Sequence, residues 1–519
     1  MQTSHFVQSS DGAASLPARI GGALLVLAIL FICYFSGLGM IGFVGNEEHY
    51  ASIAHTMVET GDWVTPHLNG APWFEKPPLY YWGAALSFKF FGFSEAAARF
   101  PCAVSALLAT LALAWLAWRL YGAETVRWLL LILPTTIAMI AFSHDAVMDM
   151  PFSGTLTIAM VFAAVRLRLV PPRDFGRSSS REPPSVSASS NFFSAVGFGC
   201  FLGLAVLAKG PAALVLCGGA VFLWALVSRR WRDASRLLHP GAIAAFCVTA
   251  LPWYILCAHR NPSFFTVFIV EHNFKRFLTP QFMHIKPFWY YIPALLLGLL
   301  PWTPGAIWGA VQGSMWLRRS KSLSSHTLFL LSWVLFVVIF FSCARTKMPG
   351  YVLPAVPFLS LLSARACERL AFERRISFAA TLVGFALAGC VRPQIAVGLD
   401  LQFAGATIPQ FLATVVLLAM GAANVILATG VLCAKRPSTR GWIISLSGVP
   451  ILFLLIAAPA FVSRSPADRI QSKDIASQLE ARQMPGEVSP HALKTGNQEG
   501  NGALQSCRAE DTTSGSCAP

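Results

Sequence analysis

The sequence is poor in charge. Only 12% of its 519 residues are Asp, Glu, Lys or Arg, whereas 55% are hydrophobic, and soluble domains usually carry about 25% charged residues. The charge-poor stretches recur along the chain and are long enough to cross about 30 Å of hydrocarbon. A single soluble core is therefore excluded, and the composition predicts an all-α polytopic membrane protein.

Several other common patterns are also lacking. The first apolar run, at 20–44, is too long for the core of a cleaved signal sequence and is expected to be an uncleaved span. The twelve cysteines show no zinc-ligand spacing, and ten of them lie in or at the ends of apolar runs. Buried membrane thiols are their expected role, although Cys507 and Cys517 can pair if their segment faces an oxidising compartment. No internal repeat is visible.

The basic residues are spread along the chain and do not form a single cluster. The formal net charge is +15, but the basic residues recur between apolar runs, as at 229–236, 318–322 and 435–440. This distribution is typical of cytoplasmic loops and argues against a nucleic-acid partner. It predicts a cytoplasmic N-terminus (1–19), a membrane domain (20–461) of about thirteen spans, and a polar, disordered tail (462–519) outside. The expected spans lie near 20–44, 96–118, 125–143, 149–169, 193–208, 211–228, 240–258, 288–316, 326–343, 350–366, 376–392, 408–433 and 441–461.

With this orientation, a second group of cations lies on the outer face, in loops where the charge rule disfavours them. Charges kept in such places are usually functional. They therefore predict a site for an anionic substrate at the outer membrane surface. The residues concerned are Lys76, Lys209, Lys275, Arg276, Lys286, Arg345 and Lys347.

The first outer loop, 45–95, is the most polar of these segments. Its stretch "EEHYASIAHTMVE" predicts an interfacial helix with apolar Tyr50, Ile53 and Met57 on one side and His55 on the solvated side. A Pro- and Gly-rich turn region follows and ends in Glu75–Lys76. The stretch at 79–92 predicts a second interfacial helix with an aromatic belt.

Six motifs in order connect this face to a known family. "NEEHYASIAHTMVETGDWVTPHLNGAPWFEKPPLYYW" resembles the first outer loop of the dolichyl-phosphate-mannose-protein mannosyltransferase superfamily. "DMPFSG", "LAVLAKGP", "EHNFKRFLTPQF", "PFWYYIPALLLGLLPWT" and "RTKMPGYVLPAVPF" continue the resemblance over about residues 20–360. It is closest to the bacterial branch, which includes the 4-amino-4-deoxy-L-arabinose lipid A transferase.

The resemblance implies a type C glycosyltransferase fold. It also implies transfer of a sugar from a polyprenyl-phosphate donor to a lipid A-like lipid, a glycan or a protein, with the active site on the periplasmic face of the bacterial inner membrane. Two other readings stay open. One is a transporter or flippase for a lipid-linked anionic solute, and the other is a catalytically silent member that binds a polyprenyl lipid. The sugar and the acceptor are left open as well.

The catalytic residues implied by the resemblance are Asn46, Glu47 and Asp149. Family members usually begin the first outer loop with Asp-Glu, where this chain has Asn46–Glu47, and an amide does not accept a proton at neutral pH. Either Glu47 or Glu48 takes over, or the acceptor is already ionised, or the enzyme is impaired. Asp149 is expected to be a second acid for acceptor binding, with a helix cap as the alternative, and Asp145 lies four residues before it.

The cations are expected to bind the carrier phosphate. By the resemblance, Glu75 and His272 are ligands of a divalent metal, zinc or another, and donor or water oxygens complete the site because zinc usually takes three or four protein ligands. The residues assigned to donor-phosphate or substrate binding are Lys76, Lys209, Lys275, Arg276, Arg345, Lys347 and Tyr351.

Overall fold

The computed structural model describes residues 16–40, 42–170, 188–275, 286–300, 302–320, 323–373, 402–403 and 406–407. The chain divides into two units, Met1–Ser463 and Arg464–Pro519. The second unit lies outside the described residues, and so do the expected spans at 376–392, 408–433 and 441–461 and the two tail cysteines.

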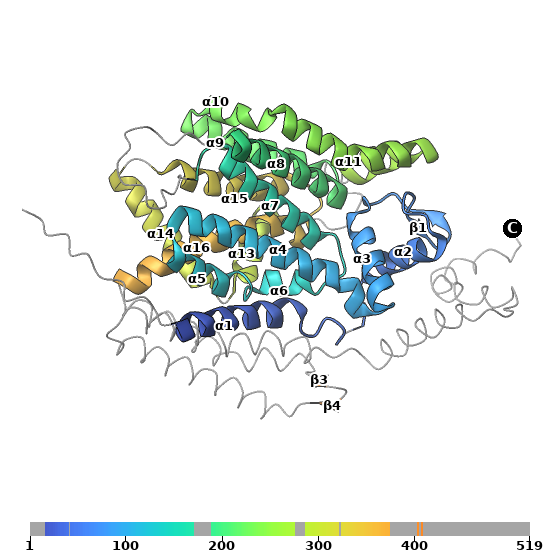
Figure 1. Cartoon of the computed structure of the whole chain (residues 1–519), viewed down its shortest axis with the longest axis horizontal. Helices are drawn as coiled ribbons and strands as arrows, with labels where there is room; N and C mark the ends of the chain where they lie inside the picture. The colour runs from blue at the N-terminus through green and yellow to red at the C-terminus, as the bar shows by residue number, and fades with distance from the viewer. Residues whose placement is uncertain are drawn as a thin grey trace, which may run out of the picture. The chain divides into compact units, whose positions relative to one another are not determined.

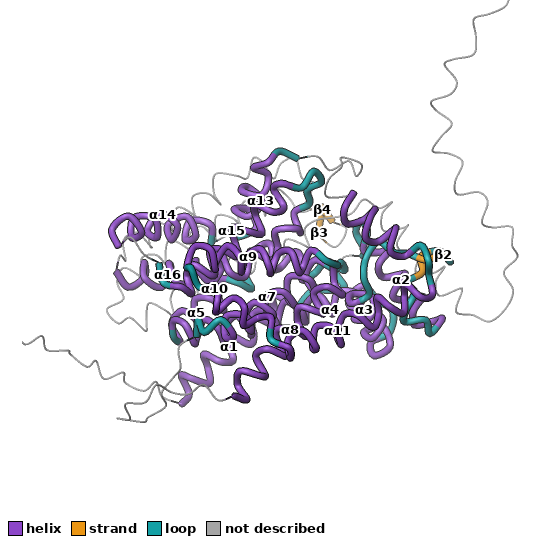
Figure 2. The backbone as a smooth tube through the Cα atoms, turned by 90° about the horizontal axis from the view of Figure 1, so that it is seen from above, coloured by secondary structure: helices purple, strands orange, loops and turns teal. Residues whose placement is uncertain are grey.

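The described part is almost entirely helical (Figures 1 and 2). Its described strands form two short antiparallel hairpins. β1 (His67–Leu68) pairs with β2 (Ala71–Pro72), and β3 (Gln402–Phe403) pairs with β4 (Ala406–Thr407). The longer helices are α1 (Leu16–Phe35), α2 (Glu47–Thr60), α3 (Leu79–Phe91), α4 (Glu95–Tyr121), α5 (Ala123–Ile132), α7 (Asp149–Arg166), α8 (Ala188–Lys209), α9 (Ala212–Ser228), α11 (Pro240–Arg260), α14 (Thr303–Ser320), α15 (Ser325–Cys343) and α16 (Val356–Glu373). The shorter ones are α6 (Ile137–Ser143), α10 (Trp231–Ala234), η1 (Ser235–Leu238), the π-helix η2 (Thr266–Lys275), η3 (Phe288–Tyr290), α13 (Tyr291–Gly298) and η4 (Pro349–Ala355).

The prediction of a polytopic membrane protein is confirmed at the level of its helices. Five stretches in the described residues are long and apolar enough to cross a membrane, and a bent pair of helices brings the number to six. The five are Glu95–Tyr121, Phe192–Lys209, Pro240–Arg260, Ser325–Cys343 and Pro349–Glu368.

Two of the expected spans are broken. The span at 125–143 is the pair α5 and α6, bent by 62° after Pro134, which has no backbone N–H to continue the helix. The span at 288–316 is divided into η3, α13 and α14. Polar groups at one break form hydrogen bonds with polar groups at the other. Ile137 N donates to Leu300 O at 3.0 Å, and Trp302 Nε1 donates to Thr135 Oγ1 at 2.8 Å. Irregular backbone is tolerated at membrane depth where protein groups pair it in this way.

Glycines set the closest helix crossings. α7 packs against α8 and α4, and α8 packs against α11. A Cβ on Gly199 of α8 would lie 2.0 Å from the Ala242 carbonyl oxygen of α11, and a Cβ on Gly154 of α7 would lie 2.9 Å from Ser105 O of α4. These helices approach so closely because no side chain separates their backbones at the crossing.

The first outer loop forms α2, the β1–β2 hairpin and α3, which lie together at one end of the helical body (Figure 1). The predicted apolar face of α2 is buried, including Tyr50, Ile53 and Met57. The prediction for His55 is wrong. It is 7% exposed, and its ring meets the Phe93 ring edge-on at 4.6 Å, because α3 and the segment after it cover that side of α2.

Candidate active site

Glu47 is the centre of a buried hydrogen-bond cluster. It begins α2 and is 2% exposed, and it pairs with Arg99 of α4, which is 3% exposed. Arg99 Nε donates to Glu47 Oε1 at 2.8 Å, and Arg99 Nη2 donates to Oε2 at 2.7 Å. Each carboxylate oxygen also accepts one backbone N–H, from Ala146 and Val44 respectively, both at 2.7 Å. Arg99 further donates to the carbonyls of Leu38 and Gly42.

This cluster holds four segments together: the segment between α1 and α2, the start of α2, the start of α4 and the loop between α6 and α7. These four hydrogen bonds occupy the acceptor sites of the carboxylate, so none is left open toward an attacking group. The surroundings of Glu47 therefore suit a positioning role.

Asp149 and Lys209 form a second cluster. Asp149 opens α7 and Lys209 closes α8, and their side chains form an ion pair that is only partly accessible. The Lys209 ammonium lies 4.7 Å from the Tyr351 ring centroid and 5.5 Å from that of Phe152. Gly350 fits closely against the acid, since a Cβ there would lie 2.7 Å from Asp149 Cγ. The structure thus brings together three residues that the sequence assigned to the site from distant segments.

Asp145 lies between these two clusters in the chain, in the loop that joins α6 to α7. Burial and the charges of Glu47 and Asp149 raise the pKa of its carboxyl to about 7, while Arg99 acts in the opposite direction. Among the residues that the structure describes, none donates a hydrogen bond to this carboxylate. Asp145 is therefore an acid whose protonation changes near neutral pH.

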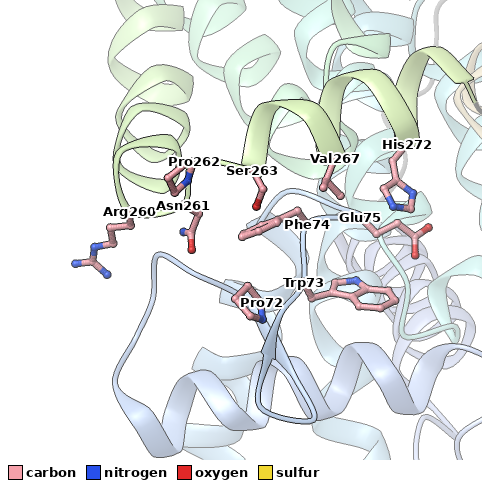
Figure 3. A pocket seen from close by; sticks show the side chains of 10 residues that line it. All are labelled: Pro72, Trp73, Phe74, Glu75, Arg260, Asn261, Pro262, Ser263, Val267 and His272. Carbon is pink, nitrogen blue, oxygen red and sulfur yellow. The ribbon is translucent and has the colours of Figure 1, made fainter.

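The third part of the site is a pocket of about 430 Å³ between the hairpin loop and the segment that follows α11 (Figure 3). The hairpin turns at Asn69–Gly70, both with positive φ, as a two-residue Asn-Gly turn requires. Glu75 follows the hairpin and lies beside His272 of η2 in the pocket (Figure 3). Lys76 Nζ is 3.1 Å from Glu75 Oε1.

The hairpin loop is held to the end of α11 by three polar contacts. Asp62 accepts from Arg260 at 3.0 Å, Thr65 accepts from Asn261 at 3.0 Å, and Val64 O accepts from Trp253 Nε1 at 2.9 Å. The pocket walls are therefore fixed to each other by hydrogen bonds, which keeps Glu75 and His272 on a common cavity.

A metal would find an incomplete set of protein ligands here. Within the described part of the chain, no group of three His, Cys, Asp or Glu side chains is arranged to hold an ion. Glu75 and His272 supply two donors, fewer than the three or four of a usual zinc site. The described residues alone therefore do not provide a closed metal site.

The remaining residues that the sequence assigns to the site are Asn46, Lys275, Arg276, Arg345 and Lys347. Asn46 is exposed at the N-terminus of α2, and its side chain makes no capping hydrogen bond. Arg345 is exposed, whereas Lys347 is 6% exposed and donates to the carbonyl of Ala344. The backbone of Lys275 ends η2. Arg276 lies outside the described residues.

Sequence reasoning missed Arg99, the partner of Glu47. A signal was available, because Arg99 is a charged residue within the apolar run expected to span at 96–118. Such charges usually have a buried partner or a function. The missing information was which of the many carboxylates in the preceding loop would meet it.

Comparison with known proteins agrees with the motifs. Residues 41–268 match the model of the dolichyl-phosphate-mannose-protein mannosyltransferase family. The undecaprenyl phosphate-alpha-4-amino-4-deoxy-L-arabinose arabinosyl transferase of Enterobacter sp. (strain 638) is 33% identical over 326 residues, which are 63% of this chain and 55% of that protein. The transferase of the same name from Serratia proteamaculans (strain 568) is 32% identical over 361 residues, 68% of this chain and 60% of its own.

The fold has a solved counterpart. The crystal structure of ArnT from Cupriavidus metallidurans bound to undecaprenyl phosphate matches with a TM-score of 0.73 and 24% identity, covering 90% of this chain and 81% of that one. This likeness shows a shared fold, while the chain spans only 55% and 60% of the two curated relatives. The resemblance that the outer-face motifs predict is confirmed: residues 41–268 are similar to the dolichyl-phosphate-mannose-protein mannosyltransferase family, and the chain is similar to these arabinosyl transferases.

Proposed function

We propose that the protein transfers a sugar from a polyprenyl-phosphate donor to an acceptor at the periplasmic face of a bacterial inner membrane. The observation that carries the proposal is a pair of lysines that are each bound to a carboxylate, Lys76 with Glu75 in the first outer loop and Lys209 with Asp149 at the ends of α8 and α7. The names of the arabinosyl transferase relatives support it. The donor sugar that they suggest is 4-amino-4-deoxy-L-arabinose, and a lipid A-like lipid is the first acceptor to test.

The reaction breaks the bond between the sugar C1 and a phosphate oxygen, which keeps the electron pair. A new bond forms between C1 and an acceptor oxygen. Lys76 and Lys209 suit the leaving phosphate, because fixed cations stabilise the charge that develops as the glycosidic bond breaks. Each lysine is neutralised by a carboxylate in the structure, so the phosphate would share or replace that carboxylate.

The remaining predicted residues extend this binding site. We assign Tyr351 to it because its ring faces the Lys209 ammonium. Exposed Arg345 is suited to attracting the anionic donor. Lys275, Arg276 and Lys347 keep the same proposed role. We propose the full topology as about thirteen spans with α2 and α3 lying in the outer interface.

A divalent metal at Glu75 and His272 remains part of the proposal only with outside ligands. The two side chains lie beside each other in one pocket and come from its two sides, so donor or water oxygens would have to complete the coordination. No catalytic step here depends on that ion. Metal analysis of the purified protein with and without undecaprenyl phosphate tests it.

The test of function uses purified protein in lipid vesicles with labelled undecaprenyl-phosphate 4-amino-4-deoxy-L-arabinose and lipid A. Sugar transfer is expected, and Lys76→Ala should lower it by about 10²-fold, the usual effect of losing one group that stabilises a transition-state charge. Lys89→Ala is the matched control, because Lys89 is an exposed lysine of α3 whose ammonium lies 4.9 Å from the Trp63 ring centroid. It should leave the rate unchanged.

Two outcomes contradict the proposal. Movement of the labelled lipid across the vesicle without transfer would favour a transporter. Binding of undecaprenyl phosphate without either transfer or movement would favour a silent lipid-binding protein.

A further inference from the structure

The first two polar residues of the first outer loop, Asn46 and Glu47, do not provide a suitable proton acceptor. This inference rests on the proposed function. Asn46 stands where the resembled family usually has Asp, and an amide does not take the proton of an attacking group. Glu47, the other member of the pair, is buried and accepts four hydrogen bonds. Neither residue can serve as the general base that a hydroxyl acceptor needs.

The loop between α6 and α7 reaches the same place from a different part of the chain. Ala146 N donates to Glu47 Oε1 at 2.7 Å, which fixes this loop against the start of α2. Asp145 directly precedes Ala146, and Asn46 directly precedes Glu47. The two residues therefore flank one hydrogen bond, one on each segment. The Asp145 carboxyl also lies close enough to those of Glu47 and Asp149 for both charges to act on it.

The other nearby acid is already engaged. Asp149 forms an ion pair with Lys209, and Lys209 is needed to bind the donor in the proposed reaction. Asp145 has a half-buried side chain and receives no hydrogen bond from the residues described. It is thus the acid of this cluster that is neither saturated by donors nor paired with a cation.

We propose that Asp145 is a further catalytic residue, the group that takes the proton from the attacking acceptor oxygen. As the oxygen bonds to C1 of the sugar, its proton passes to the Asp145 carboxylate, while the phosphate leaves with the electron pair of the broken bond. The acceptor class is a molecule whose attacking oxygen carries a proton, either a hydroxyl or a phosphate monoester in its singly ionised form. The site has moved its base from the first outer loop to the second.

The acidity of Asp145 fits this role, since a general base works best with a pKa near the operating pH. Burial, Glu47 and Asp149 raise its pKa to about 7. The base must be ionised, so the rate is expected to rise with pH up to about 7 and then level off. The charged and titratable groups around it are Glu47 of α2, Tyr80 of α3, Arg99 and Cys102 of α4, and Asp149 of α7, while neighbouring His144 contacts the carbonyls of Ile140 and Ser36.

The experiment compares wild type, Asp145→Asn, the double variant Asp145→Asn with Asn46→Asp, and the control Glu59→Gln in the transfer assay over pH 5.5–9. Glu59 is an exposed acid of α2, with a side chain 52% accessible. With a hydroxyl acceptor such as an alkyl glycoside, Asp145→Asn should lower kcat about 10²–10⁴-fold and remove the acid limb. With lipid A, the loss should appear only below about pH 6, where a phosphate monoester keeps its second proton.

Restoration in the double variant is the sharpest expected result, because a carboxylate at position 46 would return the base to the other side of the same hydrogen bond. Binding of undecaprenyl phosphate should be unchanged in Asp145→Asn. This variant should also stay folded: a raised acid pKa means that ionised Asp145 costs stability as pH rises from about 4 to 7, and the amide removes that cost.

Two results would overturn the inference while leaving the proposed function intact. One is wild-type transfer that Asp145→Asn retains with both acceptors and with an unaltered pH profile. The other is loss of undecaprenyl phosphate binding together with transfer, which would give Asp145 a structural role. If wild type transfers no sugar, the proposed function itself fails.

Discussion

At the scale of single residues, three carboxylates near one another have different roles because their partners differ. Glu47 meets a buried guanidinium and two backbone N–H groups, Asp149 meets a lysine, and Asp145 meets mainly other negative charge. The sequence marks all three as acids on the outer face. It does not show which of them will be saturated, since that depends on Arg99, Ala146 and Lys209 arriving from other segments.

Glu47→Gln tests the positioning role. The substitution removes the negative charge that neutralises the buried Arg99 guanidinium and leaves one acceptor oxygen in place of two, so we expect a loss of about 3–5 kcal/mol in the free energy of unfolding. The measurement is thermal unfolding in detergent, calibrated by denaturant titration. Glu124→Gln is the matched control, because Glu124 Oε2 also lies 2.7 Å from an arginine nitrogen, that of Arg127, but at the surface. It should cost less than about 1 kcal/mol.

The same variant separates the two roles considered for Glu47. If Glu47 were the base, Glu47→Gln would fold with wild-type stability and lose kcat alone. A stability equal to that of the Glu124→Gln control would therefore refute the positioning role.

At the scale of helices, the apolar runs locate the elements well and their interruptions poorly. The expected spans at 96–118, 240–258 and 326–343 correspond to α4, α11 and α15 within a few residues. The run at 125–143 looks continuous by hydrophobicity, and its break depends on a partner break near Leu300 that satisfies the freed backbone. The hydrophobicity of a run indicates whether it is long enough to cross the membrane. A break in the helix depends on a second segment that pairs the freed backbone groups, and hydrophobicity does not show that segment.

Helix crossings give a prediction of their own. Gly199→Ala should destabilise the protein by a few kcal/mol, because its Cβ would lie 2.0 Å from the Ala242 carbonyl oxygen and the α8 and α11 backbones must move apart. Gly218→Ala in α9 is the control, since a Cβ there meets nothing within 4 Å. Alanine favours helices by about 1 kcal/mol over glycine, so the control should be neutral or slightly stabilised in the same unfolding assay. Equal stability of the two variants would show that the crossing is looser than the structure has it.

At the scale of the whole molecule, the charge pattern anticipated which loops would form the site. The cytoplasmic N-terminus places the loops at 45–95, 143–151, 208–211 and 345–351 on one face, and all of them except 143–151 hold cations that the rule for positive charge disfavours there. The structure brings them together through Glu47 with Arg99 and Asp149 with Lys209, and through Tyr351 over the Lys209 ammonium. Pairings within that face were not predictable, because apolar runs give no information on which helices are neighbours.

The orientation of the molecule in the membrane gives the last prediction. α4 has 27 residues and a length of about 40 Å, enough to carry the chain from the active-site end to the opposite side. Glu59 lies near the first end and Arg127 follows the second, with side chains 52% and 69% accessible. In a background with its cysteines replaced by serine, Glu59→Cys in intact spheroplasts should react with a membrane-impermeant maleimide, and Arg127→Cys should react only after permeabilisation. The opposite pattern would place the proposed site in the cytoplasm, where a periplasmic acceptor could not reach Lys76 or Lys209. Labelling of both positions from outside would contradict α4 as a span, and the proposed orientation of the whole site would fall with it.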